Sequence, residues 1–304
     1  MQLVTRIYKT KPAIKEYVWA GTHLSSWNKG NPGQAIAEAW ELSFNEMGPT
    51  LIDGGEHDGE PLLDVVGKEE IGKKAASFPF FPVLIKLIDS GSNLSVQVHP
   101  TDEYALEHEH QYGKTEMWHI IAAEKGAGLY IGFKKDTSEE EVREALQNDT
   151  IIDLLNFVEV KPGDNFFIPS GTVHAIGGGV TLIEIQQNST LTYRLYDYNR
   201  LGLDGKPRAL HIDQACKVID YKKYEPITFR KPLLGECKYF TSALFDVIEG
   251  EIRASKDSFL SITFLEGEGT LDGMSYQKGT TFFIPAGVSG LLKGKGKYVA
   301  TWIK

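Results

Sequence analysis

The sequence predicts a mainly β protein that is built from two related β units. The strongest indication is an internal repeat, because residues 166–176 resemble residues 282–292, which lie 116 positions later in the 304-residue chain. A fixed-period echo is typical of a duplicated structural unit. The 31 glycines, 13 tyrosines and 15 phenylalanines of the chain favour short strands joined by tight turns.

The repeat continues upstream, where the first copy has gained an insertion. Gly126 corresponds to Gly267 at an offset of 141 residues, and the offset falls to 116 by Phe166. The difference places 25 additional residues in the first copy, and we assign them to a helical insertion near residues 134–158. Capping residues followed by three glutamates and helical spacing predict a helix over residues 139–157.

The other elements follow from local patterns. Residues 101–111 read as a short helix, and residues 201–234 read as a polar connection with weak periodicity. We expect an N-terminal unit at residues 1–234, which includes this connection, and a C-terminal unit at 235–304. Strands are expected at residues 83–88, 95–99, 116–121, 181–186, 258–264, 280–284 and 298–303.

Charge and composition exclude several classes of function. A net charge of -9 argues against a broad nucleic-acid interface, and a negatively charged ligand would need a local basic pocket. Cys216 and Cys237 lack metal-motif spacing, so we expect two reduced thiols. Residues 1–20 lack the apolar run of a signal peptide, and we expect no membrane-spanning segment. These features predict a cytoplasmic protein.

One group of polar residues predicts a metal site. In a strand over residues 95–99, Gln97 and His99 share a face, and Glu116 begins another expected strand. His174 lies just beyond the strand of the repeat. Two imidazoles, a carboxylate and an amide oxygen suit Zn²⁺ or another first-row divalent ion, with a position left open for water or substrate.

The second copy of the repeat lacks these residues. Other histidines of the chain are rejected as metal ligands. His108 and His110 point about 200° apart on a helix, and His119 lies on the opposite strand face from Glu116. We therefore expect no metal in the C-terminal unit. Its residues at the positions of Gln97, His99, Glu116 and His174 are Lys238, Phe240, Asp257 and Gly290.

Several segments resemble the type I mannose-6-phosphate isomerases, which are zinc enzymes of the cupin superfamily. The resemblance implies two cupin-like β-barrels of the jelly-roll type, with a short helical insertion in the first. It also implies one Zn²⁺ per chain. The short insertion and the residues that follow Arg194 are similar to those of a compact bacterial subgroup of this family. The matching segments are residues 15–21, 38–43, 94–100, 113–118, 169–175 and 188–194.

The resemblance implies interconversion of mannose 6-phosphate and fructose 6-phosphate through a cis-enediol. Arg194 matches the family's catalytic arginine and would stabilise negative charge. Lys114 is expected to shuttle protons near the metal. Glu184 alternates with isoleucines, so it is expected to point into the barrel and is a candidate base. The sequence leaves open which group removes the proton.

The phosphate of such a substrate needs positive charge and hydrogen-bond donors. Lys86 is a lone charge in an apolar strand, and burial without a partner would be costly, so phosphate is a candidate partner. Ser95 is a second candidate. Arg200 is a third, because it stands where the longer enzymes of the family have a lysine.

The sequence is also compatible with two other functions. His99, Glu116 and His174 would also suit a metal-dependent oxygenase on the same double-barrel fold, since non-haem iron prefers two histidines and a carboxylate. A non-catalytic sugar-phosphate binder is the third reading. For all three, we expect a small-molecule ligand, no nucleic-acid or membrane partner, and a monomer or homodimer.

Overall fold

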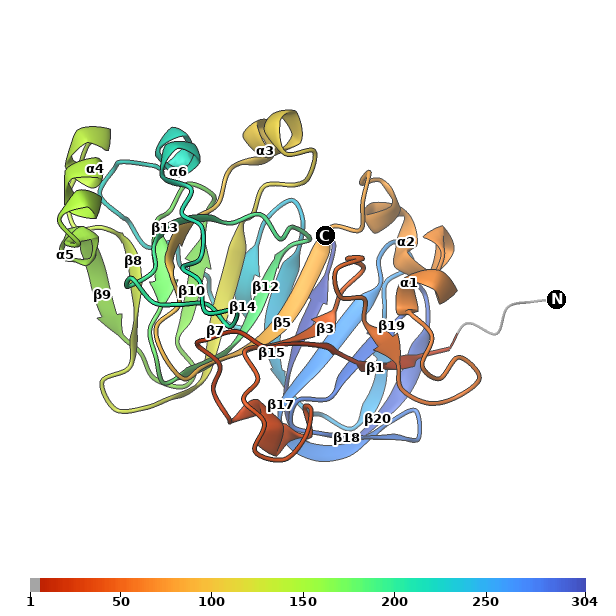
Figure 1. The fold of residues 1–304 in the computed structure, drawn as a ribbon. Coiled ribbons are helices and arrows are strands. Elements are labelled where there is room, and N and C mark those ends of the chain that lie inside the picture. The colour runs from red at the N-terminus through yellow and green to blue at the C-terminus, as the bar shows by residue number, and fades with distance from the viewer. Residues whose placement is uncertain (1–5) are drawn as a thin grey trace.

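The structure, a computed structural model, describes residues 6–304, and it is dominated by strands. Figure 1 shows two β units side by side, one with green and yellow strands and the other with blue strands. The strands are Tyr8–Lys11 (β1), Ala13–Lys15 (β2), Glu38–Leu42 (β3), Leu51–Ile52 (β4), Val83–Ser90 (β5), Val96–Val98 (β6), Glu116–Ala123 (β7), Gly128–Phe133 (β8), Leu155–Glu159 (β9), Asn165–Ile168 (β10), His174–Ile176 (β11), Val180–Gln187 (β12), Tyr193–Tyr196 (β13), Leu233–Glu236 (β14), Thr241–Asp246 (β15), Gly250–Arg253 (β16), Leu260–Leu271 (β17), Met274–Gln277 (β18), Thr281–Ile284 (β19) and Ser289–Trp302 (β20).

The helices are short and lie at the edges of the sheets (Figure 1). Within residues 6–304, none has the length and apolar character needed to cross a membrane. Both cysteines are free thiols, as expected. The helices are Leu24–Trp27 (η1, a 3₁₀ helix), Leu62–Val65 (α1), Lys68–Ala76 (α2), Asp102–His108 (α3), Glu139–Gln147 (α4), Ile151–Leu154 (α5) and Ile212–Val218 (α6).

Two sheets form the first β unit. One has six strands in the order β10-β7-β12-β5-β3-β2, and the other has five in the order β13-β6-β11-β8-β9. Trp118 and Ile120 of β7 share a buried core with Leu129 and Ile131 of β8, so the two sheets face each other. This arrangement fits the cupin-like barrel that we expected.

The second β unit is a nine-stranded sheet with a core of its own. Its main path runs β14-β15-β20-β17-β19-β1-β4, while β16 and β18 pair with β20 and β17. β1 comes from the N-terminal end of the chain, and Tyr8 pairs with Phe283 of β19. Red β1 therefore lies with the blue strands in Figure 1. The division at residue 234 stays a prediction, and two N-terminal strands pair within the C-terminal sheet.

The six-stranded sheet is covered on both faces, which explains why every residue of β5 is buried. Ile85 and Leu87 belong to a core that also contains Phe259 and Phe283 of the second unit. Ile88 belongs to the core of the first unit instead. Because side chains alternate along a strand, residue 86 also faces the interior of the first unit.

The repeated segments fold alike, as the sequence predicted. β10 and β19 each lead through a turn into another strand, which is β11 in the first unit and β20 in the second. The single helix expected over residues 139–157 is instead two helices and a strand: α4 ends at Gln147, α5 spans Ile151–Leu154, and β9 begins at Leu155. Asp149 adopts a left-handed backbone conformation (φ 57°), and residues 155–159 form β9 against β8. Strand pairing with a distant partner has overridden the helical spacing.

Two neighbouring leucines of β20 test the core of the second unit. Leu292 is 2% exposed and belongs to that core, whereas Leu291 is 47% exposed. We expect Leu292→Ala to lower the free energy of unfolding by about 2–5 kcal/mol, because it leaves a cavity. Leu291→Ala should change it by no more than about 0.5 kcal/mol. Urea unfolding of both variants measures the difference, and equal effects would contradict this assignment of the core.

Candidate active site

Three strands of the first unit bring its metal-ligating residues together. His99 follows β6 and His174 begins β11, and these strands are neighbours in the five-stranded sheet. Glu116 begins β7 of the opposite sheet. The site therefore lies between the two sheets, and residues that are far apart in the sequence meet there.

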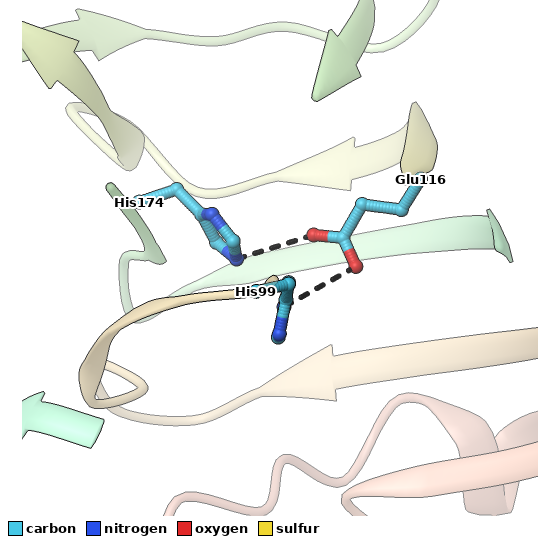
Figure 2. A group of neighbouring side chains, drawn as sticks. All are labelled: His99, Glu116 and His174. Atoms are coloured by element: carbon cyan, nitrogen blue, oxygen red, sulfur yellow. Dashed lines mark ion pairs between the residues drawn. The ribbon is translucent and has the colours of Figure 1, made fainter. Parts of the chain in front are cut away.

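Figure 2 shows the two imidazoles facing the Glu116 carboxylate, each near a different oxygen. The Nε2 atom of His174 lies 3.2 Å from Glu116 Oε1, and the Nε2 atom of His99 lies 3.6 Å from Glu116 Oε2. One ligand atom from each residue lies within 4.8 Å of the others. Among residues 6–304, this is the one group of three or more His, Cys, Asp or Glu side chains with such geometry.

Backbone carbonyls orient both imidazoles. His99 Nδ1 lies 2.9 Å from the Leu191 carbonyl, and His174 Nδ1 lies 2.9 Å from the Thr172 carbonyl. A carbonyl can only accept, so each Nδ1 donates and each Nε2 carries a lone pair on the side of Glu116, and the Lys114 ammonium donates to that of His99 at 3.0 Å. Burial lowers the pKa of His174 to about 4 and lowers the pKa of His99 well below its usual range. Both rings are therefore neutral near pH 7, as metal ligation requires.

The Glu116 carboxylate is fully buried and incompletely satisfied. The Lys114 ammonium contacts Oε2, while Oε1 has no hydrogen-bond partner among residues 6–304. Burial and the charge of Glu184 raise the pKa of Glu116, although Lys114 opposes the shift. A divalent cation would favour the ionised form. Two neutral imidazoles and this carboxylate therefore form a donor set that fits such an ion.

Gln97 lies beside this group on β6, between β13 and β11 of the five-stranded sheet. It pairs with His174 on β11 and with Arg194 on β13. Its side-chain amide nitrogen lies 3.3 Å from His174 Nε2. The amide is thus close enough to the group to supply the fourth ligand that the sequence predicted, and this role stays a prediction.

A buried network of alternating charges lies next to the metal-ligating group. Lys86 Nζ is 3.2 Å from Glu184 and 3.5 Å from Glu38, and Lys114 Nζ is 3.9 Å from Glu184. Trp118 donates to Glu184 at 2.9 Å. Burial favours the neutral acid, but Lys114 and Lys86 outweigh it and lower the pKa of Glu184. Glu184 is therefore a carboxylate.

Lys86 has partners that the sequence did not reveal. Burial alone would lower its pKa, but Glu38 and Glu184 outweigh this effect and raise it. The lysine therefore remains charged. Glu38 and Glu184 thus supply the internal partner that burial of Lys86 requires, in addition to the phosphate that the sequence suggested. Contact between Lys86 and substrate stays a prediction.

These groups line a cavity of about 310 Å³. Arg194 lies in its wall, where its Nε donates to Ser95 Oγ at 3.3 Å and its Nη1 donates to the Ala209 carbonyl at 2.8 Å. The expected site residues that line the cavity are Lys86, Ser95, Gln97, Lys114, Glu184 and Arg194.

Arg200 is not in the wall. It donates to Asp197 at 2.9 Å and to the Asn93 carbonyl at 2.5 Å. Three charged residues that the sequence analysis did not assign to the site do line the cavity: Lys15, Glu38 and Arg208. Lys15 and Glu38 lie in segments of the family resemblance. Arg208 lies in an irregular loop with no pattern to mark it.

The corresponding place in the second unit is filled by packing. Phe240 is fully buried at the position of His99. Asp257 forms an ion pair with Lys73 at 2.9 Å. At Gly290, the counterpart of His174, an added Cβ would overlap the side chain of Ile7. The histidines rejected above also lie elsewhere: His108 is exposed on α3, and His119 is not part of the metal-ligating group.

Comparisons with known proteins agree with this site, although no family model matches the chain. The chain is 36% identical over 292 residues to mannose-6-phosphate isomerase ManA of Bacillus subtilis, which covers 91% of this chain and 92% of the relative. It is 34% identical over 284 residues to the mannose-6-phosphate isomerase of Streptococcus mutans, with coverage of 88% and 89%.

A solved structure agrees with these relatives. The crystal structure of the mannose 6-phosphate isomerase from Bacillus subtilis matches with a TM-score of 0.86 and 30% identity. The match covers 97% of this chain and 99% of that chain. The identity and the near-complete coverage together decide the family. The chain belongs to the mannose-6-phosphate isomerase family.

Proposed function

We propose that this protein interconverts mannose 6-phosphate and fructose 6-phosphate with the help of one bound Zn²⁺ ion. The observation that carries the proposal is the buried group His99, Glu116 and His174, which stands beside a cavity with cationic walls. The names of the relatives supply mannose 6-phosphate, and its aldose-ketose isomerisation gives fructose 6-phosphate. Gln97 is the proposed fourth ligand. When bound, such an ion polarises the oxygens on C1 and C2 of the opened sugar.

The reaction moves one proton between carbons and one between oxygens. A base takes the proton from C2 of the aldose, a cis-enediol forms, and the proton returns at C1 while the hydroxyl proton of O2 moves to O1. Glu184 is the proposed base, because its neighbours keep it ionised at the cavity wall. Lys114 is proposed to carry the proton between the oxygens, since its ammonium reaches toward both the metal ligands and Glu184.

Arg194 has the place and the charge to stabilise the enediolate. It pairs with Gln97 across β13 and β6, so it lies next to the proposed metal ligands. Its guanidinium stays protonated at working pH and offers donors that a developing oxyanion needs. Ser95, which Arg194 contacts, and Lys86 are proposed substrate contacts, and Arg200 is proposed to act on the phosphate through Asp197.

The metal proposal is tested by elemental analysis of the purified protein. We expect about one divalent ion per chain, with zinc preferred by the mixed nitrogen and oxygen donors. Loss of a residue that only supports a metal ligand typically weakens metal binding about 10- to 100-fold. His174→Gln removes a proposed ligand itself, so we expect a larger loss of affinity. His108→Gln, on exposed α3, is the matched control and should retain the metal. Equal metal content in both variants would contradict the proposed ligand.

Arg194 is tested by a change that keeps its positive charge. Arg194→Lys loses the planar donor fork, so we expect turnover to fall about 10²- to 10³-fold. Metal content and melting temperature should stay unchanged. Arg143→Lys on exposed α4 serves as the control. A steady-state assay that couples fructose 6-phosphate formation to a dye measures turnover, and unchanged turnover in Arg194→Lys would remove this role.

Glu184 is tested with an isosteric amide. Glu184→Gln keeps the shape and can still accept from Trp118, but it cannot take a proton from C2. We expect turnover to fall about 10²- to 10⁴-fold. Incorporation of deuterium from solvent into the sugar should fall in parallel, while metal content is retained. If deuterium exchange continues at the original rate, another group is the base.

A further inference from the structure

The walls of the cavity carry more positive than negative charge. The cationic side chains are those of Lys15, Lys86, Lys114, Arg194 and Arg208, and the carboxylates are those of Glu38 and Glu184. Both carboxylates already pair with Lys86, and Glu184 also lies near Lys114. Of the other cationic side chains, Lys114 pairs with Glu116 and Arg208 pairs with Asp197, whereas Lys15 and Arg194 form no ion pair with a carboxylate among residues 6–304. This local excess contrasts with the net charge of -9 for the chain.

Two of these side chains are guanidinium groups in the same wall, and Arg194 Nη1 donates to the carbonyl of Ala209, the residue after Arg208. Arg194 forms no ion pair with a carboxylate among residues 6–304, and its contacts are with Ser95 and a backbone carbonyl. Burial lowers the pKa of Arg194, and the neighbouring charge of Arg208 lowers it further. Two like charges held together in this way attract an anion to the space between them.

Arg208 is held in place by a bidentate ion pair. Its Nε donates to Asp197 Oδ2 at 2.7 Å and its Nη2 donates to Asp197 Oδ1 at 2.6 Å. The buried Asp197 also accepts from Arg200 at 2.9 Å, so one carboxylate serves two guanidinium groups. The remaining nitrogen of Arg208, Nη1, makes no hydrogen bond to the described protein. Within the loop of residues 201–210, Arg208 is the one charged side chain that is not exposed.

We propose that Arg208 is the residue that anchors the substrate phosphate and so determines specificity for phosphorylated sugars. The proposal rests on the function proposed above. His99, Gln97 and Ser95 follow one strand face with a spacing of about 7 Å between successive residues. Arg194 contacts Ser95 at the far end of this row, beside Arg208. The reacting carbons then lie at the metal end and the phosphate at the arginine end.

The roles of Arg200 and Arg208 differ in this arrangement. Arg200 lies outside the cavity wall and contacts Asp197 and Asn93, so it acts on the phosphate through Asp197. Arg208 lies in the wall and is positioned by the same carboxylate. A guanidinium that is fixed before the ligand arrives loses little conformational freedom on binding. Arg208 is thus a preorganised donor for a phosphate dianion.

Kinetics of Arg208→Ala test this assignment. We expect kcat/KM for mannose 6-phosphate to fall about 10- to 100-fold, the effect of losing a charged hydrogen bond, mainly through KM. The inhibition constant of inorganic phosphate should rise by a similar factor. Lys206→Ala removes a charge from the same loop without touching the cavity wall, so both quantities should stay unchanged. An unchanged KM together with unchanged phosphate inhibition in Arg208→Ala would overturn the proposal.

Two further measurements keep this test independent of folding and of the proposed reaction. Arg208→Gln can still hydrogen-bond to Asp197 and carries the same expectation if Arg208→Ala does not fold. Calorimetric binding of fructose 6-phosphate and of inorganic phosphate needs no turnover. If the unmodified protein shows no isomerase activity, the proposed function fails. Weaker phosphate binding by the Arg208 variants would still support the anchor, and equal binding would refute it.

Discussion

Glu116 has no exposed surface, and the free energy of its carboxylate therefore depends on the cations and donors around it. Lys114 satisfies one oxygen, and the other faces His174 without a hydrogen-bond partner. Burial of such a group is stable only when positive charge stands nearby. The two β sheets of the first unit meet around this carboxylate, so the chemistry of the site and the packing of the fold are joined there.

The same requirement explains the charges of the adjoining network. Lys86 would be costly to bury alone, and Glu38 and Glu184 would be costly to bury without it. Together they form a chain of alternating sign that ends near Lys114. Because these charges neutralise one another, they can hold their positions without drawing on the charge of a ligand. The arginine end of the cavity differs, since Asp197 is the one carboxylate in the described part of the chain that forms ion pairs with the guanidinium groups there.

The two β units carry the same repeat with different contents. In the first unit, the repeat's histidine is His174, which lies 3.2 Å from Glu116 in a polar group beside the cavity. In the second, Gly290 leaves room for Ile7, which packs into the core from the N-terminal end of the chain. In the second unit, an apolar side chain thus fills the space that a metal-ligating side chain occupies in the first unit. This difference explains why the ligand set is confined to one copy of a duplicated motif.

The sequence by itself determined the fold class, the duplication and the His99, Glu116 and His174 group. These predictions succeeded because strand alternation and a repeated motif are local patterns that survive any tertiary arrangement. The single helix expected over residues 139–157 failed, since the chain breaks at Asp149 between α4 and α5 and the pairing of β9 with β8 decided residues 155–159. The partners of Lys86 and the place of Arg208 were also decided only by the tertiary structure. Ion pairs between distant strands and the course of an irregular loop leave no periodic mark in a single sequence, because they depend on which segments the fold brings into contact.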